Sequence, residues 1–211
     1  MKTEDFIRTL TVDRTVETSP GRALALALGV GTFIAAIVFA ELLGVREDVG
    51  EAMQTIRFPF KFVVTIALAI AGLKLISRLE RPGADVHAAA RLLIIPALLI
   101  GIAVLLELVV VPSSGWAPRM IGTNALVCLT AIPTIAVAPL VALLIVMRRA
   151  APTEPMRAGA AAGLAAAAVA ATLYGSHCTD DSPLFVVIWY SLATALVVAA
   201  GALIGSRVLR W

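Results

Sequence analysis

Six long apolar runs separated by short polar segments dominate the pattern of the chain. Each run is close to the ~20 residues that an α-helix needs to cross the hydrocarbon core of a bilayer, although the fifth is rich in alanine and only weakly apolar. Lipid leaves backbone groups no external partners, and no alternating strand pattern occurs. The pattern therefore predicts an all-α polytopic membrane protein with six transmembrane helices, at about residues 22–44, 58–79, 90–111, 122–147, 157–175 and 183–208.

Lysine and arginine are distributed unevenly among the segments between the runs. Cytoplasmic segments of membrane proteins carry an excess of these residues. With the N-terminus inside, the outer segments hold only Arg46, Arg57, Lys61 and Arg119. The cytoplasmic segments hold the other thirteen, namely Lys2, Arg8, Arg14, Arg22, Lys74, Arg78, Arg81, Arg91, Arg148, Arg149, Arg157, Arg207 and Arg210. We therefore expect both termini to be cytoplasmic.

Proline and glycine recur at the inner ends of the first, third and fifth runs. Pro20-Gly21 precedes the first run, Arg81-Pro82-Gly83 precedes the third, and Pro152, Pro155, Arg157 and Gly159 lie at the start of the fifth. The recurrence of proline and glycine at these positions predicts that the six helices form three hairpins. It also separates a cytoplasmic segment, residues 1–19, from a six-helix transmembrane sensor domain, residues 20–211.

Composition supports a membrane protein and argues against an ordinary soluble domain and against a nucleic-acid-binding protein. Apolar residues make up 60% of the 211 residues and charged residues 15%, whereas a typical soluble domain has about 25% charged residues. The formal net charge of +3 comes from arginines at the ends of apolar runs, so we expect no direct nucleic-acid partner. The acidic residues before the first run, and the length of that run, argue against a cleaved signal peptide.

The segment of residues 1–19 has the pattern of a short amphipathic helix. Thr3 is a suitable N-cap, and Glu4 follows it where an acidic side chain favours the helix dipole. Phe6, Ile7 and Leu10 would form an apolar stripe. A helix this short is marginal in water, so either the segment lies on the membrane or stays unfolded, or it docks onto a cytoplasmic partner.

Charged and small residues within the runs predict how the helices pack. Glu41 and Glu107 lie near the outer ends of the first and third runs, and Lys61 near that of the second. We expect a salt bridge between the first hairpin and the third helix, since charges at this depth usually pair. Pro133 and Pro139 should bend the fourth helix.

Two glycine pairs predict a tight contact between the last two helices. The fifth run contains Gly159 and Gly163, and the sixth contains Gly201 and Gly205. Small residues four apart let helix backbones approach closely in a membrane. The loop that joins these helices should therefore be held rather rigidly.

That loop, between Tyr174 and Pro183, contains most of the candidate chemistry. It reads Tyr-Gly-Ser-His-Cys-Thr-Asp-Asp-Ser-Pro and includes His177, Cys178, Asp180 and Asp181. Because no Lys or Arg occurs between residues 158 and 206, we expect the loop to face away from the cytoplasm. Ser182 followed by proline fits an N-cap and first helical position, so the two aspartates could also simply complement the dipole of the last helix.

The chain's two cysteines, Cys128 and Cys178, are both expected at the outer side, where a bacterial envelope is oxidising. Three interpretations remain open on the residues alone. The cysteines could be inert apolar side chains, a redox pair, or ligands of a soft divalent metal ion together with His177 and a carboxylate of Asp180 or Asp181.

Several features spread along the whole chain together resemble the NrsF-type membrane anti-sigma factors. These features are the N-terminal Met-Lys-Thr-Glu-Asp-Phe-Ile-Arg-Thr-Leu, the six spans, Gly115-Trp116 before Asn124 and Cys128, the run from Arg148 to Pro155, His177-Cys178 with Asp181-Ser182, Trp189-Tyr190 and the terminal Arg-Trp. The combination is specific, whereas no single motif in it is.

The resemblance implies a regulator of the bacterial inner membrane that binds an extracytoplasmic-function (ECF) sigma factor. In such a protein the N-terminal segment, here with Phe6, Ile7 and Leu10, would sequester the sigma factor until oxidant or heavy metal releases it. The family's two outward cysteines, on which the response depends, match Cys128 and Cys178. The identity of the stress and of the sigma factor does not carry over.

Two other classes fit the residues less well, and we expect no enzymatic activity. A membrane thiol-disulfide oxidoreductase would need more than one cysteine pair, and the chain has no Cys-x-x-Cys. A small transporter would show polar or broken helices at mid-membrane, for which the prolines of the fourth run are the only hint.

Overall fold

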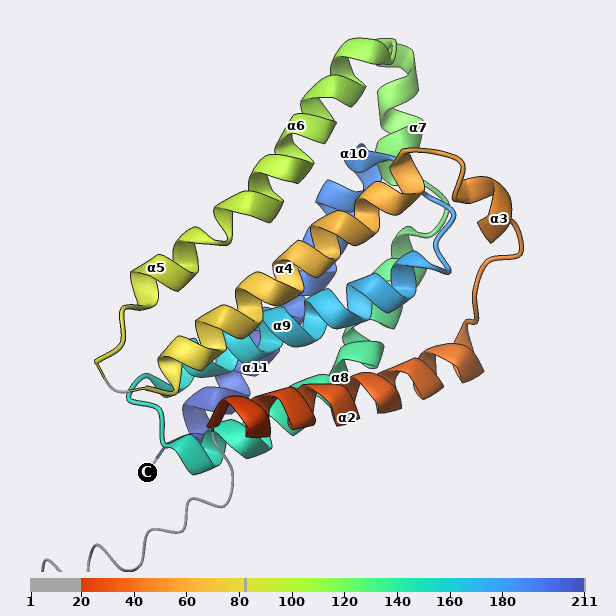
Figure 1. Ribbon diagram of the computed structural model, residues 1–211. Coiled ribbons are helices and arrows are strands. Elements are labelled where there is room, and N and C mark those ends of the chain that lie inside the picture. Colours follow the sequence, from red (N-terminus) through yellow and green to blue (C-terminus); the bar gives the residue numbers. More distant parts are fainter. Residues whose placement is uncertain (1–19, 82, 211) are drawn as a thin grey trace, which may run out of the picture.

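The computed structural model of the protein describes residues 20–81 and 83–210 (Figure 1). The described part is helical, and it contains six helices long and apolar enough to span a membrane, as the sequence predicts. The predicted segment of residues 1–19, with Phe6, Ile7 and Leu10, lies outside the described residues.

The spans lie within a few residues of their predicted positions, and two of them are interrupted. The third span changes course after α5, and the sixth contains five residues of π-helix, η2. In chain order the elements are α2 (Pro20–Leu42), α3 (Val49–Ala52), α4 (Arg57–Leu79), α5 (Val86–Arg91), α6 (Ile94–Val110), η1 (Ser113–Gly115), α7 (Trp116–Ile121), α8 (Ala125–Ala150), α9 (Pro155–Gly175), α10 (Pro183–Phe185), η2 (Val186–Tyr190) and α11 (Ser191–Val208).

The alanine-rich α9 lies at the centre of the bundle. It packs against α4, α8 and α11, and 72% of its most apolar stretch is buried, against 11% for the span made by α5 and α6. Alanine side chains are short, so neighbouring helices can approach α9 from several sides. The weak hydropathy of the fifth run therefore has a physical reason, because this helix faces other helices rather than lipid.

The final pair of helices packs as closely as its glycines predict. A Cβ atom at Gly163 would lie 2.6 Å from the Val197 carbonyl oxygen, and one at Gly205 would lie 2.7 Å from Gly159 Cα. Such distances are shorter than van der Waals contact, so the two backbones touch where only hydrogen fits. The predicted tight contact between α9 and α11 is confirmed.

The other helices do not form the predicted hairpins. Helix α2 packs along α8 and barely touches α4, while α4 packs mainly on α9 and only lightly on α6. Helix α2 approaches α8 at backbone distance at Gly31, where a Cβ atom would lie 2.5 Å from Pro139 Cα. Small residues therefore decide which helices become neighbours. Of the three predicted hairpins, only the one formed by α9 and α11 is seen.

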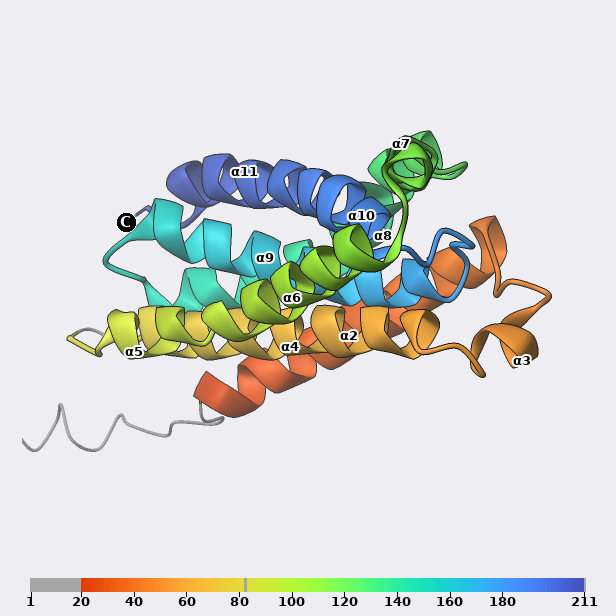
Figure 2. The same ribbon diagram turned by 90° about the horizontal axis from the view of Figure 1, so that it is seen from above.

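The bundle has two distinct ends (Figures 1 and 2). We call the end where α2 begins and α11 ends the proximal end. The opposite end, which we call the distal end, gathers three connections, residues 43–56, 111–124 and 176–182. The first and last spans thus start and finish on the same side, as an even number of spans requires.

We predict that Gly163→Ala destabilises the protein by about 1–3 kcal/mol, the usual cost of forcing a methyl group into a packed contact. The matched control is Gly101→Ala on α6, where an added Cβ atom meets nothing within 4 Å and alanine should be neutral or stabilising. Thermal unfolding of both variants in detergent measures the difference. Equal unfolding temperatures would show that α9 and α11 are not in backbone contact.

Candidate functional site

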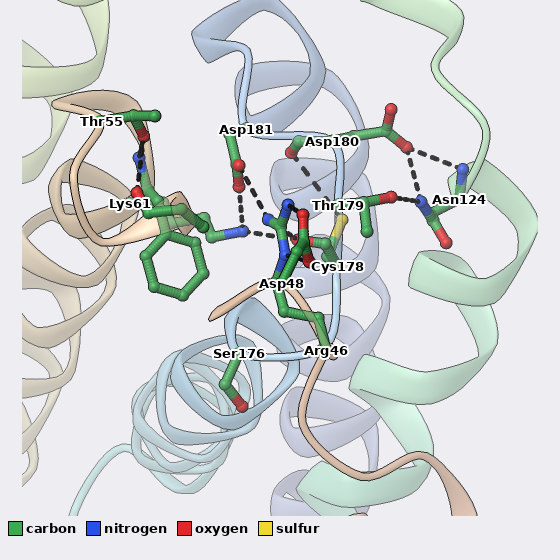
Figure 3. Close-up of polar contacts among 12 residues, drawn as sticks. Arg46, Asp48, Thr55, Lys61, Asn124, Ser176, Cys178, Thr179, Asp180 and Asp181 are labelled. Carbon is green, nitrogen blue, oxygen red and sulfur yellow. Dashed lines mark hydrogen bonds and ion pairs between the residues drawn. The ribbon is translucent and has the colours of Figure 1, made fainter. Parts of the chain in front are cut away.

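The loop of residues 176–182, which we call the cysteine loop, is held down at the distal end by two cations from other elements (Figure 3). The Lys61 ammonium on α4 donates to Asp181 Oδ1 at 2.5 Å and to the Cys178 carbonyl oxygen at 2.8 Å. The Arg46 guanidinium donates to Asp181 Oδ2 at 2.8 Å and to the same carbonyl at 3.3 Å. Both cations therefore bind the same two acceptors.

Lys61 is the more deeply placed of the two cations, with 2% of its surface exposed. Its ammonium lies 4.7 Å from the centre of the Phe58 ring, close enough for a cation–π interaction. A buried charge costs several kcal/mol unless it is paired and hydrogen-bonded. Asp181 and the Cys178 carbonyl provide that compensation. The burial of Lys61 therefore requires the closed position of the cysteine loop, and Lys61 in turn stabilises that position.

Arg46 is anchored on its other side by Asp48. Two of its nitrogens donate to the Asp48 carboxylate at 2.6 Å each, and this interaction raises the pKa of Arg46 further above its ordinary value. Arg46 also binds the cysteine loop through its backbone, because its N–H donates to the Ser176 carbonyl oxygen at 3.1 Å. The connection after α2 is thus tied to the connection before α10.

Asp180 caps a helix other than the one next to it in sequence. Its Oδ2 accepts from the backbone N–H groups of Thr123 and Asn124 at 2.9 and 2.8 Å, and from the Asn124 side chain at 2.9 Å. Asn124 precedes the first residue of α8, where N–H groups lack partners within the helix. An anion there also favours the helix dipole, so Asp180 joins the cysteine loop to the start of α8.

Neither aspartate acts on the last helix in the way that the dipole interpretation requires. Asp181 binds Lys61 and Arg46, and the cap of α10 comes from Ser182, whose Oγ accepts from the Leu184 N–H at 3.3 Å. The prediction that Ser182 is an N-cap followed by Pro183 at the first helical position is confirmed.

Glu107 is the centre of a second ion-pair cluster at the distal end. It accepts from Arg57 at 2.7 Å and from Arg119 at 2.6 Å, and Ser182 donates to it at 3.2 Å. The expected salt bridge between the second and third spans therefore exists, but its cation is Arg57 rather than Lys61. Lys61 points to the cysteine loop instead.

The two cysteines belong to the apolar core of the bundle, a cluster that extends from Leu24 near the proximal end to the residues under the distal connections. Cys128 on α8 and Cys178 are both fully buried and are not bridged. Tyr174, Phe185 and Tyr190 belong to the same cluster, with the two tyrosine rings 5.7 Å apart. Cys128 lies one turn after Asn124, which Asp180 of the cysteine loop binds, so both thiols lie at the distal end and both are shielded from solvent.

The cysteine loop buries the Cys178 thiol completely. Burial raises the pKa of the Cys178 thiol, and the nearby Lys61 ammonium offsets this only in part. The thiol donates a weak hydrogen bond to the Asp180 carbonyl oxygen at 3.8 Å. Since the thiolate is the reactive form, Cys178 needs the loop to open before it can react readily.

The arrangement gives no support to the predicted metal site. His177 Nδ1 lies 3.1 Å from the Gly44 carbonyl oxygen. The Asp180 and Asp181 carboxylates are engaged by the α8 backbone and by cations. Within residues 20–81 and 83–210, no three His, Cys, Asp or Glu side chains form a group that could hold a metal ion.

Sequence reasoning identified the cysteine loop but missed what holds it. Arg46 and Asn124 were not singled out for this role, and Lys61 was assigned the wrong kind of partner. A usable signal was present, since Arg46 and Lys61 are two of only four cations in the segments predicted to lie outside, beside a loop with two aspartates.

We predict that Lys61→Met increases the rate at which a maleimide labels Cys178 by at least about tenfold, measured in membranes in a Cys128→Ser background. Breaking a buried ion pair costs about 3–5 kcal/mol. A loss of 1.4 kcal/mol in the stability of the closed loop is enough to raise the population of the open loop tenfold.

The matched control is Asp48→Asn, which removes an exposed partner of Arg46 from the same network. Exposed ion pairs contribute about 0–1 kcal/mol, so this variant should label within about fivefold of the parent. Equal labelling of the Lys61 variant and its parent would mean that Lys61 does not hold the loop.

The chain is similar in sequence to known proteins over nearly its whole length. Residues 10–211 match the model of the NrsF family, described as "Negative regulator of sigma F". The chain is 34% identical over 213 residues to a probable anti-sigma-F factor NrsF of Azospira oryzae, and 34% identical over 217 residues to the anti-sigma-F factor NrsF of Caulobacter vibrioides. Both matches cover 100% of each chain, and no solved structure matches. The chain therefore belongs to the NrsF family of negative regulators of sigma F.

Proposed function

We propose that the protein is an inner-membrane anti-sigma factor whose cytoplasmic segment, residues 1–19, sequesters an ECF sigma factor, and that oxidation of Cys128 and Cys178 releases it. One observation carries the sensing part of the proposal: both cysteines are buried at the distal end, Cys178 in a loop fastened by ion pairs and Cys128 one turn after the Asn124 that this loop binds. The relatives' description as anti-sigma-F factors supports the regulatory part. In this proposal the distal end faces the periplasm.

The resting state has both thiols reduced and covered. The cysteine loop is fastened to α4 through Lys61, to the connection after α2 through Arg46, and to α8 through Asp180. Local opening of the loop exposes Cys178 to water, where its pKa returns towards the ordinary value. An oxidant in the periplasm therefore meets the thiol only when the loop is open.

Oxidation then joins the cysteine loop to α8. The two thiols lose two protons and two electrons and form one S–S bond, and a peroxide takes up both and is reduced to water or an alcohol. A disulfide requires Cα atoms within about 7 Å and a defined dihedral angle, so its formation would fix the position of the loop relative to α8. A soft divalent metal ion that bridges the two thiolates would join the same two elements.

The packing of α2 on α8 offers a route from the cysteines to the cytoplasmic segment. Cys128 lies in the first turns of α8, and farther along α8 Pro139 contacts Gly31 of α2 at backbone distance. Helix α2 follows residues 1–19 directly. A shift of α8 is therefore passed to the helix that carries the sigma-binding segment, and the two prolines of α8 make it the most deformable of the spans.

We predict that Cys128→Ser/Cys178→Ser leaves repression of the sigma factor intact and abolishes its induction by peroxide, so that a sigma-dependent reporter stays within about twofold of its unstressed level. The physical reason is that hydroxyl groups cannot form the S–S bond. Cys128→Ala/Cys178→Ala is the control for buried polarity and should behave identically. Loss of repression in both double variants would instead show that the cysteines serve only the packing of the distal end.

We predict that Phe6→Ala/Ile7→Ala/Leu10→Ala frees the sigma factor. Each large apolar side chain buried in a groove contributes about 1.5–3 kcal/mol, so losing three should weaken binding by at least about a hundredfold. Co-purification of the sigma factor from membranes measures this, with Thr11→Ala/Thr15→Ala as the control within the same segment. Undiminished capture by the triple variant would place the binding surface on other cytoplasmic segments.

A further inference from the structure

A groove at the proximal end combines an apolar wall with two arginines. It has a volume of about 460 Å³ and lies between the last turns of α8 and α11. Its wall is formed by Val141, Leu144, Ile145, Ile204 and Val208, and its mouth by Arg148 and Arg149. Four of the five wall residues expose 40% or more of their surface, so the groove opens outward to the surroundings of the helix bundle.

The position of the groove places its two parts in different layers of a membrane. Helix α8 has 26 residues, and at 1.5 Å per residue it is longer than the ~30 Å hydrocarbon core. The apolar wall therefore lies at the depth of acyl chains, and the arginines one turn farther on lie at the depth of lipid headgroups. Both arginine side chains are exposed.

The charge of the mouth favours an anion. Arg148 and Arg149 contribute two positive charges, and within residues 20–81 and 83–210 neither forms a salt bridge, whereas Arg157 nearby is paired with Glu154. The C-terminal ends of α8 and α11 each contribute about −0.5 charge. The arginines therefore more than compensate both helix dipoles, and a net positive charge remains at the mouth.

We infer that this groove, which we call the arginine groove, binds an anionic phospholipid, with the phosphate at Arg148 and Arg149 and an acyl chain along the wall of α8 and α11. Arginine binds phosphate through two parallel N–H donors, and basic pockets between transmembrane helices on the cytoplasmic side bind anionic headgroups. The site lies at the opposite end of the bundle from the cysteines, so it does not depend on their oxidation, whereas its placement on the cytoplasmic side rests on the proposed function. It would fix the ends of α8 and α11 relative to the bilayer.

The test is native mass spectrometry of the full chain in detergent, with dioleoyl phosphatidylglycerol or dioleoyl phosphatidylcholine added. We expect phosphatidylglycerol to bind the parent protein preferentially. Arg148→Gln/Arg149→Gln should weaken that binding about 30-fold, which corresponds to about 1 kcal/mol per arginine. The matched control is Arg78→Gln/Arg81→Gln, which removes two exposed charges from the same end outside the groove and should change binding less than twofold.

A second variant tests the wall without changing charge. Val141→Phe/Ile204→Phe places two large side chains at exposed wall positions and should also displace the lipid, while circular dichroism checks that the helices are retained. Equal binding of phosphatidylcholine, or equal loss in the Arg78 and Arg81 control, would overturn the inference.

Two rival occupants give distinct results. Complete displacement of phosphatidylglycerol by millimolar inorganic phosphate would mean that the arginines bind a free anion rather than a lipid. Phosphatidylglycerol binding that appears only after deletion of residues 2–17 would mean that the acidic side chains of that segment occupy the groove. Either result would overturn the inference.

Discussion

The distal end depends on one buried cation. Lys61, with 2% of its surface exposed, is compensated by Asp181 and by the Cys178 carbonyl, both on the cysteine loop. Removing water from an ammonium group costs several kcal/mol, and only well-placed partners return that energy. The closed position of the loop and the burial of Lys61 therefore require each other. This mutual requirement is what keeps the two thiols covered.

In the proposed sensing function, the ion pairs of Lys61 with Asp181 define a closed arrangement of the loop, and breaking them defines an open one. Shifting a two-state equilibrium from 1:99 to 99:1 takes about 5.5 kcal/mol, and a disulfide typically contributes about 2–4 kcal/mol. Oxidation alone would thus give a partial shift of the two-state equilibrium.

Much of the architecture was predictable because it follows from local pattern. Six apolar runs of sufficient length gave six spans, the paired glycines gave the contact between α9 and α11, and Ser182-Pro183 gave a helix start. The hairpin arrangement was not predictable. In a membrane helix all faces are apolar, so periodicity does not reveal which face meets another helix. The alanines of α9 do not by themselves indicate which helices pack against it, and the central position of α9 follows only from the tertiary structure.

The sequence by itself determined the helices, the family and the presence of a polar loop with one cysteine, since these depend on residue types and on neighbours along the chain. Only the tertiary structure decided that Lys61 holds Asp181 rather than a glutamate, that Asp180 caps α8, and that Cys128 and Cys178 are both buried at the distal end. Those partners are 50 or more positions apart. A charge or a thiol can pair with any suitable group that the fold brings within reach, and that choice is made by helix packing.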